Sequence, residues 1–198
     1  MEMLPAAFAS GWASGINAWA TVLVLGLIGR FSGIEGIPAG FERTDVLVVV
    51  GILCAIELVA DKIPYIDSTW DAISTVIRPI AGAAIGALYA GANGDLAIIT
   101  LASVGGITAL VSHLTKSGIR LAVNTSPEPF TNVAASSAGD VTVTGMATLI
   151  ALAPVAAAVV AGILLVLGLI VLAFLVHRIR RGWLAFQRWR RRDSPAPA

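Results

Sequence analysis

Six long apolar segments, separated by short polar stretches, make up most of the chain. They cover about residues 7–29, 44–61, 70–92, 96–116, 133–152 and 155–177. Each segment is close to the roughly 20 apolar residues that a transmembrane helix needs. The last two form one apolar run that Pro154 divides, because proline begins helices well and continues them badly. The pattern therefore predicts an all-α integral membrane protein with about six transmembrane helices, or five if this run is a single kinked helix.

Composition supports this fold class. Of the 198 residues, 57% are hydrophobic and 13% are charged, whereas a soluble domain is about a quarter charged. The N-terminal sequence MEMLPAAFAS contains Glu2 but no lysine or arginine, so it lacks the basic region of a secretory signal peptide. We therefore expect the first segment to be retained. The single Cys54 can form no intrachain disulfide, and its apolar surroundings predict a small buried side chain.

Basic residues gather on one side of the predicted topology. With six spans both termini share a side, and the opposite loops hold Arg30 and Arg43. The terminal side holds Lys62, Lys116, Arg120 and the tail arginines 178, 180, 181, 188, 190, 191 and 192. Cytoplasmic loops carry an excess of lysine and arginine. Both termini are therefore expected in the cytoplasm.

Two proline-containing polar loops face that side. In DKIPYIDSTWDAI, Ser68 and Asp71 have the spacing of a capping box that begins the third span. NTSPEPF repeats this pattern with Thr125 and Glu128. The acids either only begin helices or form a cytoplasmic vestibule that gathers cations or contacts a head group. The vestibule and its rim would comprise Asp61, Asp67, Asp71, Asn124 and Glu128.

Arg78 and Asp140 are charges that lie inside predicted spans. Each is eight residues from the expected start of its helix, about 12 Å deep at 1.5 Å per residue. An unpaired charge at the bilayer centre costs about 2.5–3.5 kcal/mol on the insertion scale, so we expect the two to pair. Asp71 shares a helix face with Arg78 and could compete for it, and Glu57 is a further intramembrane acid. The pair is either a structural ion pair or a substrate or proton site.

The first segment carries a polar stripe. Ser10, Ser14, Asn17 and Thr21 fall on one face of a helix. This stripe either packs against a neighbouring helix or lines a polar pathway, for which Asn17 and Thr21 are the candidates. Small-residue pairs, which let helices approach closely, occur at Gly11 and Gly15 and again at Gly82 and Gly86.

A short sequence echo suggests an internal repeat. ASGINA at 13–18 resembles VGGITA at 104–109. The two copies lie three spans apart, an odd number, so the halves of the chain would be inverted relative to each other. Inverted repeats are common in transporters, and their sites lie where the repeats meet.

The C-terminal segment HRIRRGWLAFQRWRRR is basic and aromatic. We expect an amphipathic helix on the anionic cytoplasmic leaflet, with no nucleic-acid partner. Its lipid-interface residues would be Arg178, Arg180, Arg181, Trp183, Trp189 and Arg190. The predicted division is a transmembrane domain over 1–178 and a tail over 179–198 that ends in a disordered segment.

Catalytic and metal-binding motifs are missing from the sequence. It contains no HExxH, CxxC or phosphate-cradling loop, and His113 and His177 are poor metal candidates. We therefore expect no metal, no cofactor and no enzymatic activity, although a membrane-embedded enzyme is a minor alternative.

Three segments carry a family resemblance. FASGWASGINAWATVLVLGLIGRF, ELVADKIPYIDSTWDAISTVIRPIAGA and NTSPEPFTNVAASSAGD resemble the bacterial membrane family catalogued as domain of unknown function 4126, over about residues 7–175. The resemblance implies a multi-pass protein of the bacterial inner (plasma) membrane and implies no activity.

These observations favour a small transporter, channel or flippase for an ion or a small or anionic solute. Six short spans barely enclose a pathway, so a homo-oligomer is expected. The alternative is a structural or scaffold protein whose charges join helices and whose tail binds lipid or partners.

Overall fold

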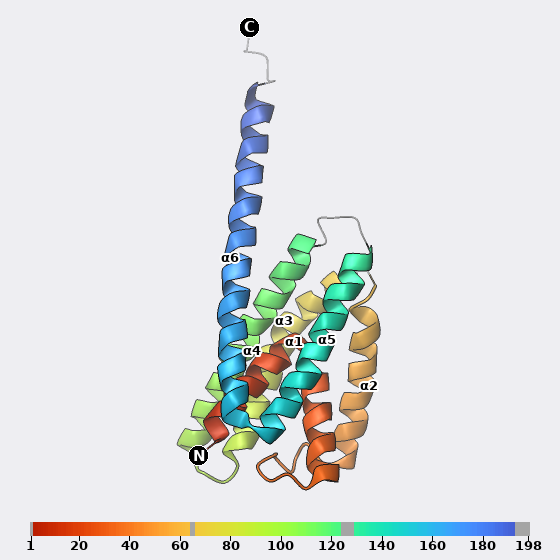
Figure 1. Cartoon of the computed structure of the whole chain (residues 1–198), viewed down its shortest axis with the longest axis vertical. Helices are drawn as coiled ribbons and strands as arrows, with labels where there is room; N and C mark the ends of the chain where they lie inside the picture. The colour runs from red at the N-terminus through yellow and green to blue at the C-terminus, as the bar shows by residue number, and fades with distance from the viewer. Residues whose placement is uncertain (1, 64–65, 124–128, 193–198) are drawn as a thin grey trace.

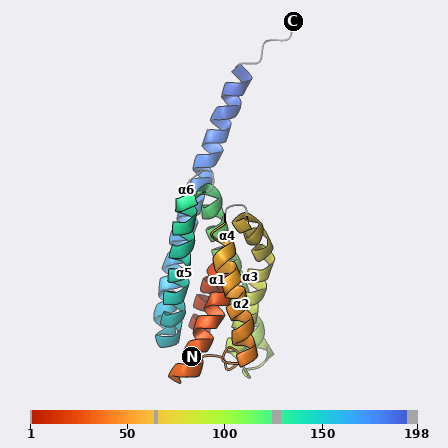
Figure 2. The ribbon, with the colours of Figure 1, turned by 90° about the vertical axis from the view of Figure 1, so that its right-hand side faces the viewer.

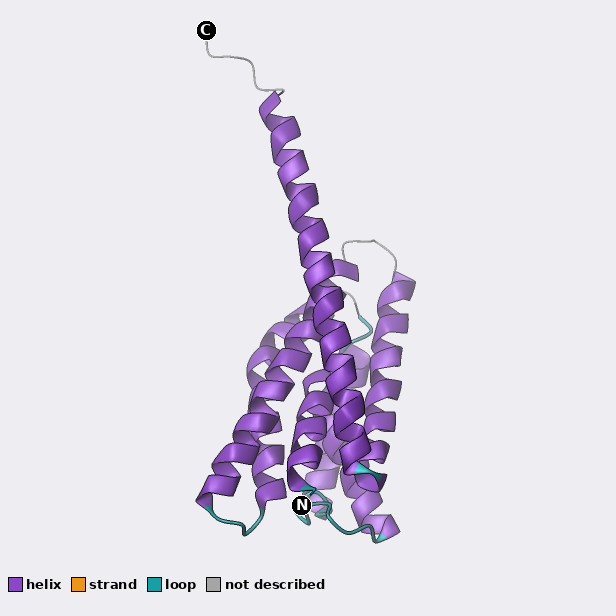
Figure 3. Ribbon diagram, turned by 60° about the vertical axis from the view of Figure 1, so that its left-hand side comes forward, coloured by secondary structure: helices purple, strands orange, loops and turns teal. Residues whose placement is uncertain are grey.

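The computed structural model describes residues 2–63, 66–123 and 129–192, and within these ranges it contains helices and no strand (Figures 1 and 3). The helices are α1 (Met3–Ser32), α2 (Thr44–Ala60), α3 (Ile66–Ala90), α4 (Asp95–Val123), α5 (Pro129–Leu152) and α6 (Pro154–Arg192). The prediction of an all-α membrane protein is confirmed. The predicted hairpin at Pro154 is also confirmed, since α5 ends and α6 begins there as separate helices.

Five helices are long and apolar enough to cross a membrane, judged by length and composition: α1, α3, α4, α5 and α6. The remaining helix, α2, has 17 residues and is about 26 Å long at 1.5 Å per residue. Its length is at the short end of what spans a bilayer.

α1 is broken in its middle. Asn17 has φ −153° and ψ 101°, an extended conformation inside an otherwise helical segment. The first half runs beside α4 in the same direction, since Gly11 packs on Gly105 and the carbonyl oxygen of Ile16 contacts Lys116. The second half runs beside α2 in the opposite direction. There the Cα of Gly26 faces Leu47, and the earlier residue Ala20 packs with Cys54, which lies further along α2.

Both ends of α1 therefore lie at the same end of the bundle (Figure 1). Met3 accepts a hydrogen bond on its sulfur from Asn93, in the turn between α3 and α4, at 3.4 Å. Phe41, in the loop after α1, packs edge-on against Tyr89 near that turn, with ring centroids 6.1 Å apart. We call this the N-terminal end, and we call the opposite end, beyond which α6 projects, the tail end (Figures 1 and 2).

This re-entrant path differs from the continuous first span that the sequence predicts. The halves of α1, residues 3–16 and 18–32, are each about 21–23 Å long, shorter than the hydrocarbon core of about 30 Å. The first apolar segment thus enters the bundle and returns rather than crossing it. The two ends of the described chain lie at opposite ends of the bundle (Figure 1), and the cytoplasmic location of both termini stays a prediction.

Close packing of small residues holds α1, α3 and α4 together. A Cβ added to Gly11 would lie 2.6 Å from the carbonyl oxygen of Gly105, and one added to Gly82 would meet the Cβ of Ala109 at 2.5 Å. The predicted packing role of these glycines is confirmed. The echoed segments 13–18 and 104–109 belong to helices that run in parallel here, whereas an inverted repeat predicts antiparallel copies.

α6 is attached more loosely. It packs against α1, α4 and α5, but most of its membrane-length stretch is exposed. It continues as one helix through 178 and 179 to Arg192 and projects beyond the tail end (Figures 1 and 2). Arg178, Arg180, Arg181 and Trp183 are exposed, while the side chains of Trp189 and Arg190 lie outside the described residues. Lipid binding by this segment and the predicted domain boundary stay predictions.

Candidate functional site

Two polar helix faces meet inside the bundle. On α3 the buried residues Asp67, Asp71, Ser74 and Arg78 follow a helical spacing that places them on one face. α4 contributes a second face with the same kind of spacing, and α2 supplies two acids from its last turn and C-cap. We call the ionisable side chains of these faces the charge network: Glu57, Asp61, Asp67, Asp71, Arg78, Lys116 and Arg120.

Arg78 is the deepest base of the charge network. Its side chain is 2% exposed and forms a salt bridge with Glu57, which is 1% exposed. Its Nη1 also donates to the carbonyl oxygen of Gly15 at 2.9 Å. The predicted pair of Arg78 with Asp140 is wrong: Asp140 accepts from Lys62 at 3.3 Å. The physical reason is that α1 packs against both α3 and α5 and lies between them, so equal depth did not bring the two residues together.

Asp61 connects the two bases of α4. Its carboxylate accepts from Lys116 at 2.8 Å and from Arg120 at 3.0 and 3.1 Å. Arg120 also donates to Asp71 at 3.2 Å. Asp61 lies just beyond the last residue of α2. Burial there favours its neutral form, but hydrogen bonds from Arg120 and the charges of Lys116 and Arg120 lower its pKa well below the usual range.

The break in α1 points into this network. A helix end leaves backbone carbonyls without helical partners, and here the carbonyls of Gly15 and Ile16 accept from Arg78 and Lys116, the latter at 2.8 Å. Asn17 caps the second half of α1, because its Oδ1 accepts from the backbone N–H of Ala20 at 2.9 Å. At the break, therefore, Asn17 caps the second half of α1, and Arg78 and Lys116 bind the last carbonyl oxygens of the first half.

The residues of the predicted polar stripe are all fully buried, but the break divides them between the two halves of α1. Ser14 and Thr21 bond to the backbone carbonyls of Gly11 and Asn17, and Ser10 donates to Tyr89 at 3.4 Å. Thr21 therefore serves local packing here. Asn17 is different, since its Nδ2 is buried without a hydrogen-bond partner among the described residues.

A buried histidine joins the site. His113 Nε2 lies 3.1 Å from both the backbone oxygen of Asp71 and Thr75 Oγ1. The structure shows no group of three His, Cys, Asp or Glu side chains that could hold a metal within the residues it describes. His113 therefore acts as a hydrogen-bonding link between α3 and α4.

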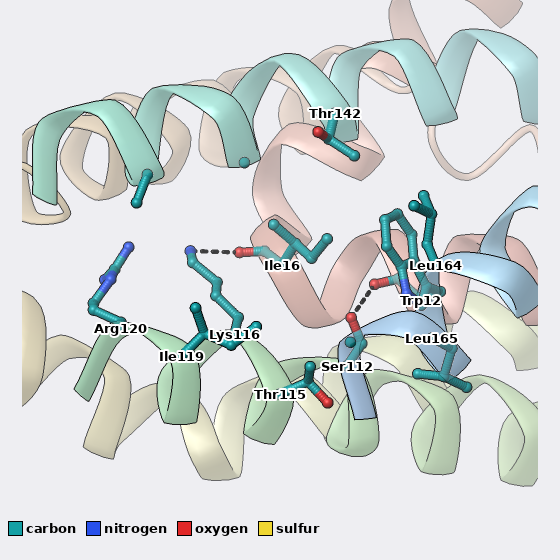
Figure 4. A pocket seen from close by; sticks show the side chains of 13 residues that line it. Trp12, Ile16, Ser112, Thr115, Lys116, Ile119, Arg120, Thr142, Leu164 and Leu165 are labelled. Carbon is teal, nitrogen blue, oxygen red and sulfur yellow. Dashed lines mark hydrogen bonds between the residues drawn. The ribbon is translucent and has the colours of Figure 1, made fainter. Parts of the chain in front are cut away.

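Two cavities flank α4 at the level of Arg120. One, of about 240 Å³, lies among α1, α4, α5 and α6 and is lined by Lys116, Arg120, three hydroxyl residues and apolar side chains that include Trp12; Figure 4 shows it. The other, of about 400 Å³, lies between α3 and α4 and is lined by Asp71, Thr75 and Arg120. Arg120 lines both cavities.

The outcome for the predicted vestibule is mixed. The structure brings Asp61, Asp67 and Asp71 close to one another, but they are 1%, 0% and 6% exposed and form no open mouth. α3 begins at Ile66, so Ser68 and Asp71 do not act as a capping box at its start. Asn124 and Glu128 lie outside the described residues.

Sequence reasoning missed Lys116, Arg120 and His113 as site residues. The fourth span was expected to end at residue 116 because of its charge, whereas α4 continues to Val123. The sequence did contain a signal for them, because positions 113, 116 and 120 fall on one face of a helix. A solvent-exposed loop is not expected to have this helical spacing.

Comparison with known proteins gives one result. The family model described as Domain of unknown function (DUF4126) matches residues 4–174. No curated protein and no solved structure matches the chain. The matched region contains the re-entrant α1, the whole charge network and both cavities beside Arg120. The chain therefore belongs to the DUF4126 family, and it does so through the part of the molecule that carries the buried charges.

Proposed function

We propose that the protein is a small membrane transporter for an anionic solute, with its site at the tip of α1 and the charge network. The observation that carries the proposal is the break at Asn17 inside the bundle. Membrane transporters often use discontinuous helices whose broken ends face the transported group, because free backbone groups there can bind it. A structural bundle has no need to interrupt a helix at this depth.

The contacts of the charge network support a site that can change partners. Asp61 is shared by Lys116 and Arg120, and Arg120 is shared by Asp61 and Asp71. The Arg120–Asp61 pair can therefore open while Arg120 keeps Asp71 and Asp61 keeps Lys116. Exchange of this kind lowers the cost of exposing a buried cation to an incoming anion, since an unpaired buried charge is expensive.

The two cavities give the solute a route. They lie on opposite sides of α4 and have Arg120 in common. A rotation of this side chain between them would present its charge first to one cavity and then to the other. Lys116 lies beside the break in α1, where it contacts both Asp61 and Ile16. It would bind the same solute as Arg120. Association of several copies stays a prediction.

The test is a flux assay in proteoliposomes with two probes, radiolabelled inorganic phosphate and a fluorescent head-group-labelled phosphatidylglycerol. Arg120→Lys keeps the positive charge but loses the planar fork that contacts two acids at once. We expect it to lower the initial rate of the transported probe about tenfold, about 1.4 kcal/mol of lost stabilisation. Arg43→Lys is the matched control, because Arg43 is an exposed arginine paired with Asp45 outside the site.

The flux rates of the wild-type protein decide between a transporter and a scaffold protein. Rates equal to those of protein-free liposomes for both probes would overturn the proposal and favour the scaffold interpretation. An equal effect of Arg120→Lys and Arg43→Lys would show that transport does not pass the charge network.

A further inference from the structure

We infer that the cavity among α1, α4, α5 and α6 binds an anionic phospholipid from the bilayer. Its phosphate would contact Lys116 and Arg120, and the first part of an acyl chain would occupy the apolar remainder (Figure 4). Naming this lipid as the transported solute rests on the proposed function, whereas the binding itself does not.

The electrostatics of the cavity favour an anion. Lys116 and Arg120 line it, and among the residues that the structure describes no acid lines it; the partner acid Asp61 is outside the lining. An ammonium group carries three N–H donors, and Lys116 uses two of them in the structure, toward Ile16 and Asp61. One donor of Lys116 therefore remains for a phosphate oxygen without breaking an existing bond.

The walls of the cavity favour an amphiphile over a small hydrophilic ion. The walls are largely apolar, with Trp12, Leu164 and Leu165 at the end away from Arg120 (Figure 4), and Ser112, Thr115 and Thr142 add three hydroxyl groups. An ion that entered alone would lose its hydration against these side chains, which is costly. An acyl chain that comes from the bilayer has no hydration to lose and can contact these walls without this cost.

The position of the cavity favours a ligand from the membrane. Ala135 and Thr142 line it from α5, and both are exposed on the surface of the bundle. They lie within the membrane-length part of α5, so the opening faces lipid rather than water. A volume of about 240 Å³ is too small for a whole two-chain lipid, so the rest of the molecule would stay in the bilayer.

Trp12 provides the readout, because it lines the cavity and is 5% exposed. In a single-tryptophan variant, the other four tryptophans are replaced by phenylalanine: Trp19, Trp70, Trp183 and Trp189. This protein is placed in phosphatidylcholine nanodiscs with increasing amounts of phosphatidylglycerol that carries bromine on its acyl chains. Bromine quenches tryptophan fluorescence at short range. We expect half-maximal quenching at about a tenfold lower mole fraction than with brominated phosphatidylcholine.

Filling the cavity should remove this selectivity. A Cβ at Gly139 would meet Ile16 at 3.5 Å, an ordinary contact, so Gly139→Leu fits and extends into the cavity. Gly145→Leu is the matched control on the same helix, because nothing lies within 4 Å of its added Cβ and it does not line the cavity. Circular dichroism checks that both variants are helical. The control should keep the wild-type selectivity.

Three results would overturn the inference: equal quenching by the two brominated lipids, unchanged selectivity in Gly139→Leu, or loss of quenching when inorganic phosphate is added in excess. The last would identify a free anion as the ligand. The quenching and flux experiments distinguish failure of the lipid-binding inference from failure of the proposed transport function. Selective quenching without flux would leave the lipid as a bound structural ligand, and flux without selective quenching would leave transport with another solute.

Discussion

Two ion pairs at the end of α2 show how differently the same kind of residue can be used. Glu57 pairs with Arg78 of α3, and both side chains are at most 2% exposed. Five residues later, Lys62 pairs with Asp140 of α5, and these side chains are 36% and 22% exposed. The first pair is enclosed by α1 and α3, whereas the second is partly exposed on the surface of the bundle.

The comparison teaches that depth along a helix does not determine the environment of a charge. Arg78 and Asp140 lie at similar depth, but α3 turns Arg78 inward and α5 leaves Asp140 near the surface. How far the side chain is buried between neighbouring helices decides how much an ion-pair partner contributes to stability. The predictions below follow that order of burial.

Removal of one partner of the inner pair should have the largest effect. Glu57→Gln leaves the guanidinium of Arg78 buried without a counter-charge, and breaking a buried pair in this way costs about 3–5 kcal/mol. We expect this loss in the free energy of unfolding, measured by SDS-induced unfolding followed by circular dichroism.

The matched double variant tests whether the cost comes from the unpaired charge. Glu57→Leu combined with Arg78→Met replaces both charges by apolar side chains of similar size, which is often neutral or stabilising for a buried pair. The double variant should therefore be more stable than Glu57→Gln. If it were less stable, the polar contact with Gly15 rather than the ion pair would hold this region.

An intermediate effect is expected at Asp61. Asp61→Asn removes the charge that Lys116 and Arg120 share, but Arg120 keeps Asp71 and Lys116 keeps the carbonyl oxygen of Ile16. We expect a loss of about 1–3 kcal/mol, the range for weakening a buried hydrogen-bonded group, in the same unfolding assay. A loss as large as that of Glu57→Gln would show that Asp71 does not compensate.

The fold was predictable in outline because hydrophobic length reports membrane helices directly. The approximate positions of the helices, the hairpin at Pro154 and the small-residue contacts of Gly11 and Gly82 all follow from local sequence. The re-entrant path of α1 does not. A single Asn17 in an apolar run of spanning length is also compatible with a straight helix, and the break depends on Arg78 and Lys116 binding the freed carbonyls.

The candidate site was predictable by residue type but not by pairing. Arg78, Glu57, Asp61 and Asp71 stand out because charges are costly in hydrocarbon, and all four belong to the charge network. Their partners depend on which helices are neighbours in space, and one sequence does not specify that arrangement. Arg120 was overlooked because a charge at the end of an apolar segment is normally solvated.

The outer pair should have the smallest effect and completes the comparison. Lys62→Gln and Asp140→Asn each remove one charge from a pair that is partly exposed, and exposed pairs are typically worth less than about 1 kcal/mol. Lys62 also donates to the backbone oxygen of Leu58 at 3.0 Å, a bond that glutamine can reproduce in part. Both variants should therefore unfold within about 1 kcal/mol of the wild type in SDS. A loss from Asp140→Asn as large as that from Glu57→Gln would mean that Asp140 is shielded in the membrane, and the contrast between the two pairs would no longer hold.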